Sequence, residues 1–192
     1  MERRKFKTDG ICRDSSKSLT GYAAKFYKET ELSKFCEMIV PGAFRETIKK
    51  DDIKALLNHD KNYVLGRNKS GTLTLAEDGI GLKVAIILPD TQDGRDLAVS
   101  IERGDINQMS FAFKVRDEEW IKRTGQKDLR KLRKVQLFDV SVVTFPAYEN
   151  TDISVMRSHV GSGFSNIILP FMGISEAHSI EHYADVSGLI RR

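Results

Sequence analysis

The sequence predicts a mainly β fold with a few peripheral α-helices, built as one domain. Short apolar segments with the two-residue alternation of strands recur through the first three quarters of the 192 residues. Glycine and proline fall between these segments as turn signals. The length is sufficient for one buried core. The pattern leaves open whether the strands form a barrel or a sandwich.

The expected elements follow in chain order. Strands are expected over residues 19–27, 37–40, 53–57, 63–65, 72–75, 81–88, 107–115 and 135–144. A short helix is expected over 43–50, after the Pro41-Gly42 turn, because Phe44 and Ile48 lie four apart on one helical face. The charged stretch 116–134 is expected to form a loop or a long hairpin.

A second helix is expected over 93–102. Thr91 or Asp93 is a suitable N-terminal cap for this helix, and Gly104 is a suitable C-terminal end. Behind Pro146 the chain changes character, with Ser, Gly and His around one apolar patch. We therefore expect a domain over 1–157 and a C-terminal tail over 158–192 that is flexible or docked on a partner.

Composition excludes several classes of function. The net charge of +4 is mildly basic and argues only weakly for an anionic partner. Cys12 and Cys36 match no metal-ligand spacing and no disulfide framework, which favours a reducing compartment. The basic N-terminus is followed by no apolar stretch, and no apolar run approaches the roughly 20 residues of a membrane span. We therefore expect a protein that is neither secreted nor embedded in a membrane.

The sequence also predicts no cofactor and no metal. It contains no glycine-rich phosphate loop, no Cys/His zinc pattern and no dinucleotide fingerprint. His178 and His182 lie four apart, but only Glu181 is nearby as a third ligand, so a metal site there is not favoured.

Three residues have contexts that suit catalysis. His59 follows an apolar strand, Ser110 lies on the opposite strand face from Met109 and Phe111, and Asp139 interrupts an apolar strand. A serine nucleophile needs a base, and the base needs an acceptor that fixes its tautomer. Taken separately, each residue has an ordinary structural interpretation. These are a histidine that closes a turn, a solvent-facing serine and an edge acid paired with a basic side chain.

Four sequence blocks, in order, resemble the prohead-protease family of tailed phages, which is distantly related to the herpesvirus assemblins. The blocks are Glu37-Met38-Ile39-Val40-Pro41-Gly42-Ala43-Phe44; Leu56-Leu57-Asn58-His59-Asp60 with Val64-Leu65-Gly66-Arg67; Asn107-Gln108-Met109-Ser110-Phe111-Ala112-Phe113; and Leu137 to Tyr148. The resemblance implies an assemblin-like β-barrel, closed or partly open. It implies a serine endopeptidase in which Ser110 attacks the scissile carbonyl and His59 carries the proton. Asp139 would orient His59, and Asp60 is the rival for this role.

The resemblance also implies a setting. The substrate would be the scaffolding portion of the major capsid protein, cleaved inside a procapsid in the host cytoplasm. The enzyme would cleave itself as well, which fits the tail, and it could act as a homodimer. The alternative is a catalytically inactive capsid scaffold or assembly protein. A nucleic-acid-binding module would rest only on the basic stretch 123–134, without a stacking platform or recognition helix.

Overall fold

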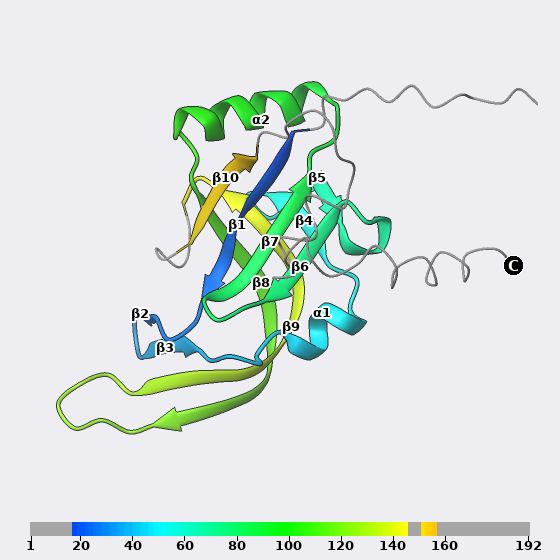
Figure 1. Cartoon of the computed structure of the whole chain (residues 1–192). Coiled ribbons are helices and arrows are strands. Elements are labelled where there is room, and N and C mark those ends of the chain that lie inside the picture. Colours follow the sequence, from blue (N-terminus) through cyan, green and yellow to red (C-terminus); the bar gives the residue numbers. More distant parts are fainter. Residues whose placement is uncertain (1–16, 146–150, 157–192) are drawn as a thin grey trace, which may run out of the picture.

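The computed structural model describes residues 17–145 and 151–156, whose strands form two sheets (Figure 1). The first sheet has the strand order β10-β1-β7-β6, and every pair in it is antiparallel. Its strands are β1 (Ser18–Lys25), β6 (Leu73–Glu77), β7 (Gly81–Ile87) and β10 (Asp152–Met156).

The second sheet has the order β2-β3-β9-β4-β5. In addition, β8 pairs with β9 along the edge of β9 opposite to β3 and β4. The pairs of β9 with β3 and with β4 are parallel. Its strands are β2 (Glu29–Glu31), β3 (Cys36–Ile39), β4 (Lys54–Leu57), β5 (Asp60–Arg67), β8 (Gln108–Ile121) and β9 (Leu129–Val143).

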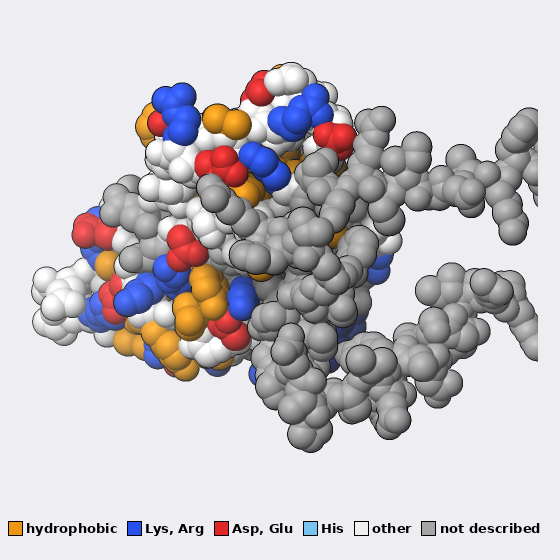
Figure 2. Space-filling model, turned by 45° about the horizontal axis from the view of Figure 1, so that its top comes forward, with side chains coloured by type: hydrophobic (Ala, Val, Ile, Leu, Met, Phe, Trp, Pro, Cys, Tyr) orange, Lys and Arg blue, Asp and Glu red, His pale blue; other side chains and the backbone are white. Residues whose placement is uncertain are grey.

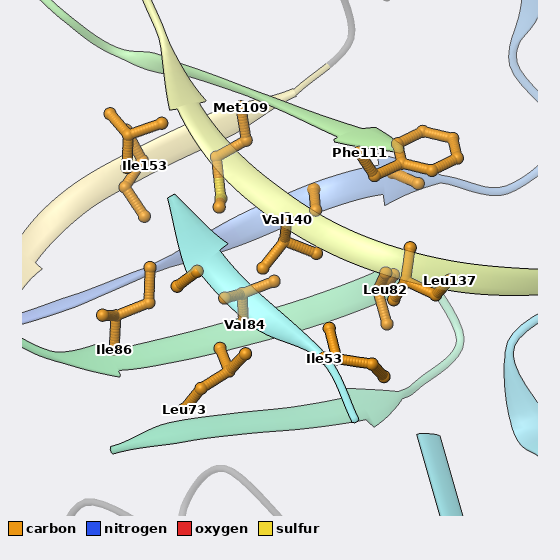
Figure 3. Packing of buried hydrophobic residues seen from close by; sticks show 14 of the residues in the cluster. Ile53, Leu73, Leu82, Val84, Ile86, Met109, Phe111, Leu137, Val140 and Ile153 are labelled. Atoms are coloured by element: carbon orange, nitrogen blue, oxygen red, sulfur yellow. The ribbon is translucent and has the colours of Figure 1, made fainter. Parts of the chain in front are cut away.

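One apolar cluster joins the two sheets. Side chains from both sheets converge on it, as Figure 3 shows for Leu82, Val84 and Ile86 of β7, facing Met109 of β8 and Val140 of β9. All five are fully or almost fully buried. Removing this much apolar surface from water is the main stabilising term of the fold. It also fixes which face of β8 and β9 points inward.

The helices flank the sheets (Figure 1). In α2 (Gln92–Arg103), the hydroxyl of Thr91 accepts a hydrogen bond from the Gly94 amide, and Gly104 ends the helix with φ of 82°. Thr91, rather than Asp93, therefore caps this helix. The short helix α1 (Arg45–Lys50) and the η1 turn (Asn68–Ser70) are the other helical elements in the described part of the chain.

The structure confirms the mainly β class and each expected strand and helix, with shifted ends. Sequence reasoning missed β2 and β10. The charged stretch 116–134 is the outer part of a long β8–β9 hairpin, the second of the two forms expected for it. Within the described residues the strands form two sheets and no closed barrel, so the barrel is not confirmed. The tail over 158–192, with His178 and His182, and Cys12 lie outside the described residues.

The surface carries charges of both signs. Figure 2 shows Lys and Arg side chains interspersed with Asp and Glu on the face that it presents, with hydrophobic groups between them. Cys36 is a free, partly exposed thiol. In the described part of the chain, no helix has the length and apolar character needed to cross a bilayer.

Candidate active site

His59 lies in the tight turn between β4 and β5. Leu57 and Asp60 are directly opposed, so Asn58 and His59 are the two central residues of the turn, with φ values of 51° and 57°. Positive φ at both positions defines the type I′ hairpin turn, whose twist matches that of the flanking strands. Asparagine and histidine tolerate this left-handed conformation better than most residues. The turn therefore presents the imidazole at the end of the hairpin.

Asn58 ties this turn to the end of β9. Its amide donates to the Val142 carbonyl at 2.9 Å, and its side-chain Oδ1 accepts from the Thr144 amide at 2.9 Å. The turn is thus held from two directions against the strand that carries Asp139. Such anchoring offsets the backbone strain of two consecutive residues with positive φ.

A β-bulge at Phe138 sets the orientation of Asp139. Across the hairpin, Ala112 opposes Asp139 and Phe113 opposes Leu137, so Phe138 is the extra residue of β9. Leu137 is buried in the core on one side of the bulge, and Val140 is buried there on the other. Strict alternation would place residue 139 on the same face as Leu137. The bulge instead turns Asp139 to the face that points away from the core.

Helix α1 and the turn that precedes it support β9 beside the bulge. The hydroxyl of Thr47, itself buried, accepts a hydrogen bond from the Leu137 amide at 2.8 Å. The Val135 amide donates to the Ala43 carbonyl at 3.0 Å. These two contacts give hydrogen-bond partners to backbone amides of β9 that lie between the stretches pairing with β3 and β4.

The imidazole of His59 contacts Asp139 directly. His59 Nδ1 and Asp139 Oδ1 are 2.6 Å apart, and the side chains are 37% and 13% exposed. Ser141, on the same face of β9, donates from its hydroxyl to the same Oδ1 at 2.7 Å. A charge-assisted contact of this length favours the tautomer with hydrogen on Nδ1. Nε2 is then left with the lone pair that a general base needs.

Ser110 lies on β8 directly opposite Ser141. Directly opposed residues of an antiparallel pair project to the same face, so Ser110 shares the face of Asp139 and Ser141. Its neighbours Met109 and Phe111 are buried in the core on the other face, as the alternation predicts. Ser110 is only 4% exposed.

Thr151, which precedes β10, holds the backbone beside Ser110. Its hydroxyl accepts from the Met109 amide at 3.0 Å and donates to the Met109 carbonyl at 2.8 Å. Both backbone groups of the residue before Ser110 are thereby fixed. This reciprocal pair restrains the position of Ser110 along β8.

Asp60 has different partners from Asp139. Its Oδ1 accepts from the Asn62 amide and from the Asn62 side chain, both at 2.9 Å. Asp60 therefore stabilises the start of β5. In the described residues, the carboxylate in contact with His59 is that of Asp139.

Two residues that support this arrangement did not stand out in the sequence. Asn58 could have been found as an asparagine beside a candidate base at a strand end, since such residues favour turns. Ser141 could have been found from its spacing of two from Asp139, which places both on one strand face. The basic stretch 123–134 lies on the outer part of the hairpin, where Arg123 pairs with Glu29 and Arg130 with Glu37. In the described residues, no group of three or more His, Cys, Asp or Glu is arranged to hold a metal ion.

A serine and an aspartate on one face of a sheet, with a histidine from a neighbouring turn paired to the aspartate, define a candidate serine hydrolase site. Residues 4–163 match the family model described as caudovirus prohead serine protease, and the chain belongs to this family. It is therefore a serine peptidase. It is also 29% identical over 164 residues to the prohead protease of Enterobacteria phage HK97, over 81% of this chain and 70% of that protein.

Proposed function

We propose that this chain is the endopeptidase of phage head maturation, with Ser110 as nucleophile, His59 as general base and Asp139 as the residue that orients the base. The 2.6 Å contact between His59 Nδ1 and Asp139 Oδ1, on the face that Ser110 shares, is the observation that supports this assignment most strongly. It also favours Asp139 over Asp60 as the third member.

In the proposed reaction, Ser110 Oγ attacks the scissile carbonyl carbon while Nε2 of His59 takes the hydroxyl proton. The imidazolium donates this proton to the leaving amine as the carbon–nitrogen bond breaks, which leaves an acyl-enzyme. Water then attacks the ester, with His59 again accepting and returning a proton, and Ser110 is regenerated. Asp139 stabilises the imidazolium without itself taking the proton. Backbone amides would stabilise the oxyanion.

The proposed substrates are the scaffolding portion of the major capsid protein and the enzyme itself, inside the procapsid in the host cytoplasm. The family match and the similarity to a prohead protease support this setting. We further propose an assemblin-like, partly open arrangement of the two sheets, a C-terminal tail removed by self-cleavage, and activity as a homodimer. No cofactor is required, because side chains and backbone amides can supply each step.

The experiment that tests this function is co-expression with the cognate major capsid protein. Wild type is compared with Ser110→Ala, and both chains are read by intact mass. Wild type is expected to shorten the capsid protein and itself, while Ser110→Ala leaves both at full length. Ser18→Ala serves as a control, since Ser18 is also a buried strand serine but lies on β1.

The outcomes separate the alternatives. If neither version cuts any chain under assembly conditions, the inactive scaffold interpretation replaces the enzyme. If cleavage persists in Ser110→Ala, another residue is the nucleophile. A C-terminus that stays uncut over days in an enzyme active on the capsid protein excludes self-cleavage of the tail.

A further inference from the structure

Ser141 occupies an enclosed position in the middle of the second sheet. It is fully buried, it opposes Ser110 on β8, and its neighbour on β4 is Leu56. A buried hydroxyl without a partner costs free energy, so its hydrogen bonds are informative. Both of its recorded partners belong to the candidate site.

The single hydroxyl hydrogen of Ser141 has one preferred acceptor. Its Oγ lies 2.7 Å from Asp139 Oδ1 and 3.2 Å from His59 Nδ1. The carboxylate is both the closer and the charged acceptor, and hydrogen bonds to ionised groups are the stronger ones. The hydrogen therefore belongs to the bond with Asp139.

Two donors consequently meet at one oxygen. Asp139 Oδ1 accepts from Ser141 Oγ and lies 2.6 Å from His59 Nδ1. Rotation of the carboxylate away from the imidazole would break the bond to Ser141 and leave a buried hydroxyl to find a new partner. Because the hydroxyl is bonded to the carboxylate, it also does not compete by donating to Nδ1. Such a donation would favour the tautomer that is wrong for a general base.

We propose that Ser141 is a positioning residue for the peptidase reaction, whose hydroxyl fixes the Asp139 carboxylate against the Nδ1–H of His59. This inference rests on the proposed roles of Ser110, His59 and Asp139. Ser141 acts through Asp139 and does not touch the substrate. On β9, Ser141 lies between Ser110 on β8 and Leu56 on β4, the strand that leads to His59.

The test uses the full chain and a fluorophosphonate, which forms a covalent bond to an activated serine and requires no knowledge of the cleavage sequence. The inactivation rate constant and the apparent binding constant are measured separately, and the adduct is located by peptide mass. The variants are Ser141→Ala, Asp139→Asn and the double variant, with Ser110→Ala as the negative control. Ser18→Ala is the matched control, since its buried hydroxyl has no hydrogen-bond partner in the described residues.

Ser141→Ala is expected to lower the inactivation rate constant by about 10- to 100-fold, by analogy with the loss of a hydrogen-bond partner that orients a metal ligand. The binding constant should change little. In the Asp139→Asn background the same substitution is expected to have less than about a threefold effect, because interacting residues are not additive. Ser18→Ala should behave as wild type.

A rate within about twofold of wild type in Ser141→Ala would overturn the inference, as would an equal loss in both backgrounds. If Ser141→Ala does not fold, Ser141→Cys is measured in its place. Its thiol is a weak hydrogen-bond donor, so the inactivation rate constant should fall in the wild-type background and not in the Asp139→Asn background. Labelling that persists in Ser110→Ala would instead refute the assigned nucleophile. The two failures are therefore distinguishable.

Discussion

The two halves of the β8–β9 hairpin use different interactions to stay in place. The inner segment, residues 108–115 with 135–143, carries Ser110 and Asp139 and packs buried apolar side chains into the core. The outer segment, residues 116–121 with 129–134, buries Leu129 and Leu132 but otherwise relies on charged and aromatic contacts. In Figure 1 β2 and β3 lie alongside this outer part, and the tip of the hairpin projects beyond them.

Arg130 is the centre of the outer contacts. It pairs with Glu37 at 3.2 Å and with Glu118 at 2.5 Å. Its guanidinium also lies 5.6 Å from the ring of Phe35 and 5.8 Å from that of Trp120. These contacts join β3 and the preceding Phe35 to the hairpin, and they depend on the charge of Arg130. The comparison indicates that core packing and buried hydrogen bonds fix the geometry of the candidate site on the inner segment. The contacts that respond to pH and salt lie on the outer segment.

The largest expected effect on stability comes from the inner segment. Leu137→Ala removes a side chain that is 1% exposed beside the Phe138 bulge. The expected loss in the free energy of unfolding is about 2–5 kcal/mol, measured by urea titration with far-UV circular dichroism. Ile80→Ala, at a side chain that is 53% exposed, is the control and should change stability by less than about 0.5 kcal/mol. A loss below about 1 kcal/mol in Leu137→Ala would contradict the assigned role of the inner segment.

A smaller effect is expected in the outer segment. Arg130→Leu removes the ion pair with Glu37, which is only 3% exposed, and should cost about 1–3 kcal/mol. The single tryptophan, Trp120, reports this region by fluorescence. Peptidase activity should stay near the wild-type value, since the site lies on the inner segment. Arg133→Leu, whose partner Asp117 is exposed, is the matched control and should be nearly neutral. Loss of activity at unchanged stability in Arg130→Leu would break the distinction between the segments.

The smallest effect is a response to acid. Hydrogen bonds from Trp120 and then from Arg130 lower the pKa of Glu118 below its ordinary value of 4.5, and Arg123 lowers the pKa of Glu29 in the same way. A lowered carboxylate pKa contributes stability that is present above the ordinary value and is lost as pH falls through the lowered one. Trp120 fluorescence should therefore change below pH 4.5 before the far-UV signal of the whole domain does.

The Glu118→Gln variant is the control for this titration. Its amide carries no negative charge, so the fluorescence change should already be partly present at neutral pH and should depend less on pH. If fluorescence and circular dichroism change together at one pH in the wild type, the outer segment is not an independently titrating part.

Much of the fold could be predicted because it depends on local patterns. The alternation around Ser110 placed Met109 and Phe111 in the core, and Thr91 and Gly104 gave the ends of α2. The strands β2 and β10 were missed because each is short, and its strand character depends on pairing with a neighbouring strand, β3 for β2 and β1 for β10. In β10, for example, Gly21 of β1 allows close approach, since a Cβ there would lie 2.0 Å from the Asp152 carbonyl oxygen.

The arrangement of the candidate site was predictable in part for a similar reason. His59, Ser110 and Asp139 stood out by residue type and context, but their arrangement depends on the bulge at Phe138 and on the positive φ values of the Asn58-His59 turn. Asn58 is a local signal for the turn, although the turn has no glycine, and no local signal marks the bulge at Phe138. The pairing of His59 with Asp139 rather than Asp60 results from a β4–β9 contact between segments far apart in sequence.

The central claim is that Ser110 and His59 work as one unit. The most direct measurement is the rate of cleavage of the major capsid protein by Ser110→Ala, His59→Ala and the double variant, each checked for folding. Residues that act in one chemical step are not additive, so the account predicts that all three variants share the same residual rate. Independent losses that multiply in the double variant, or substantial cleavage by either folded single variant, would contradict it.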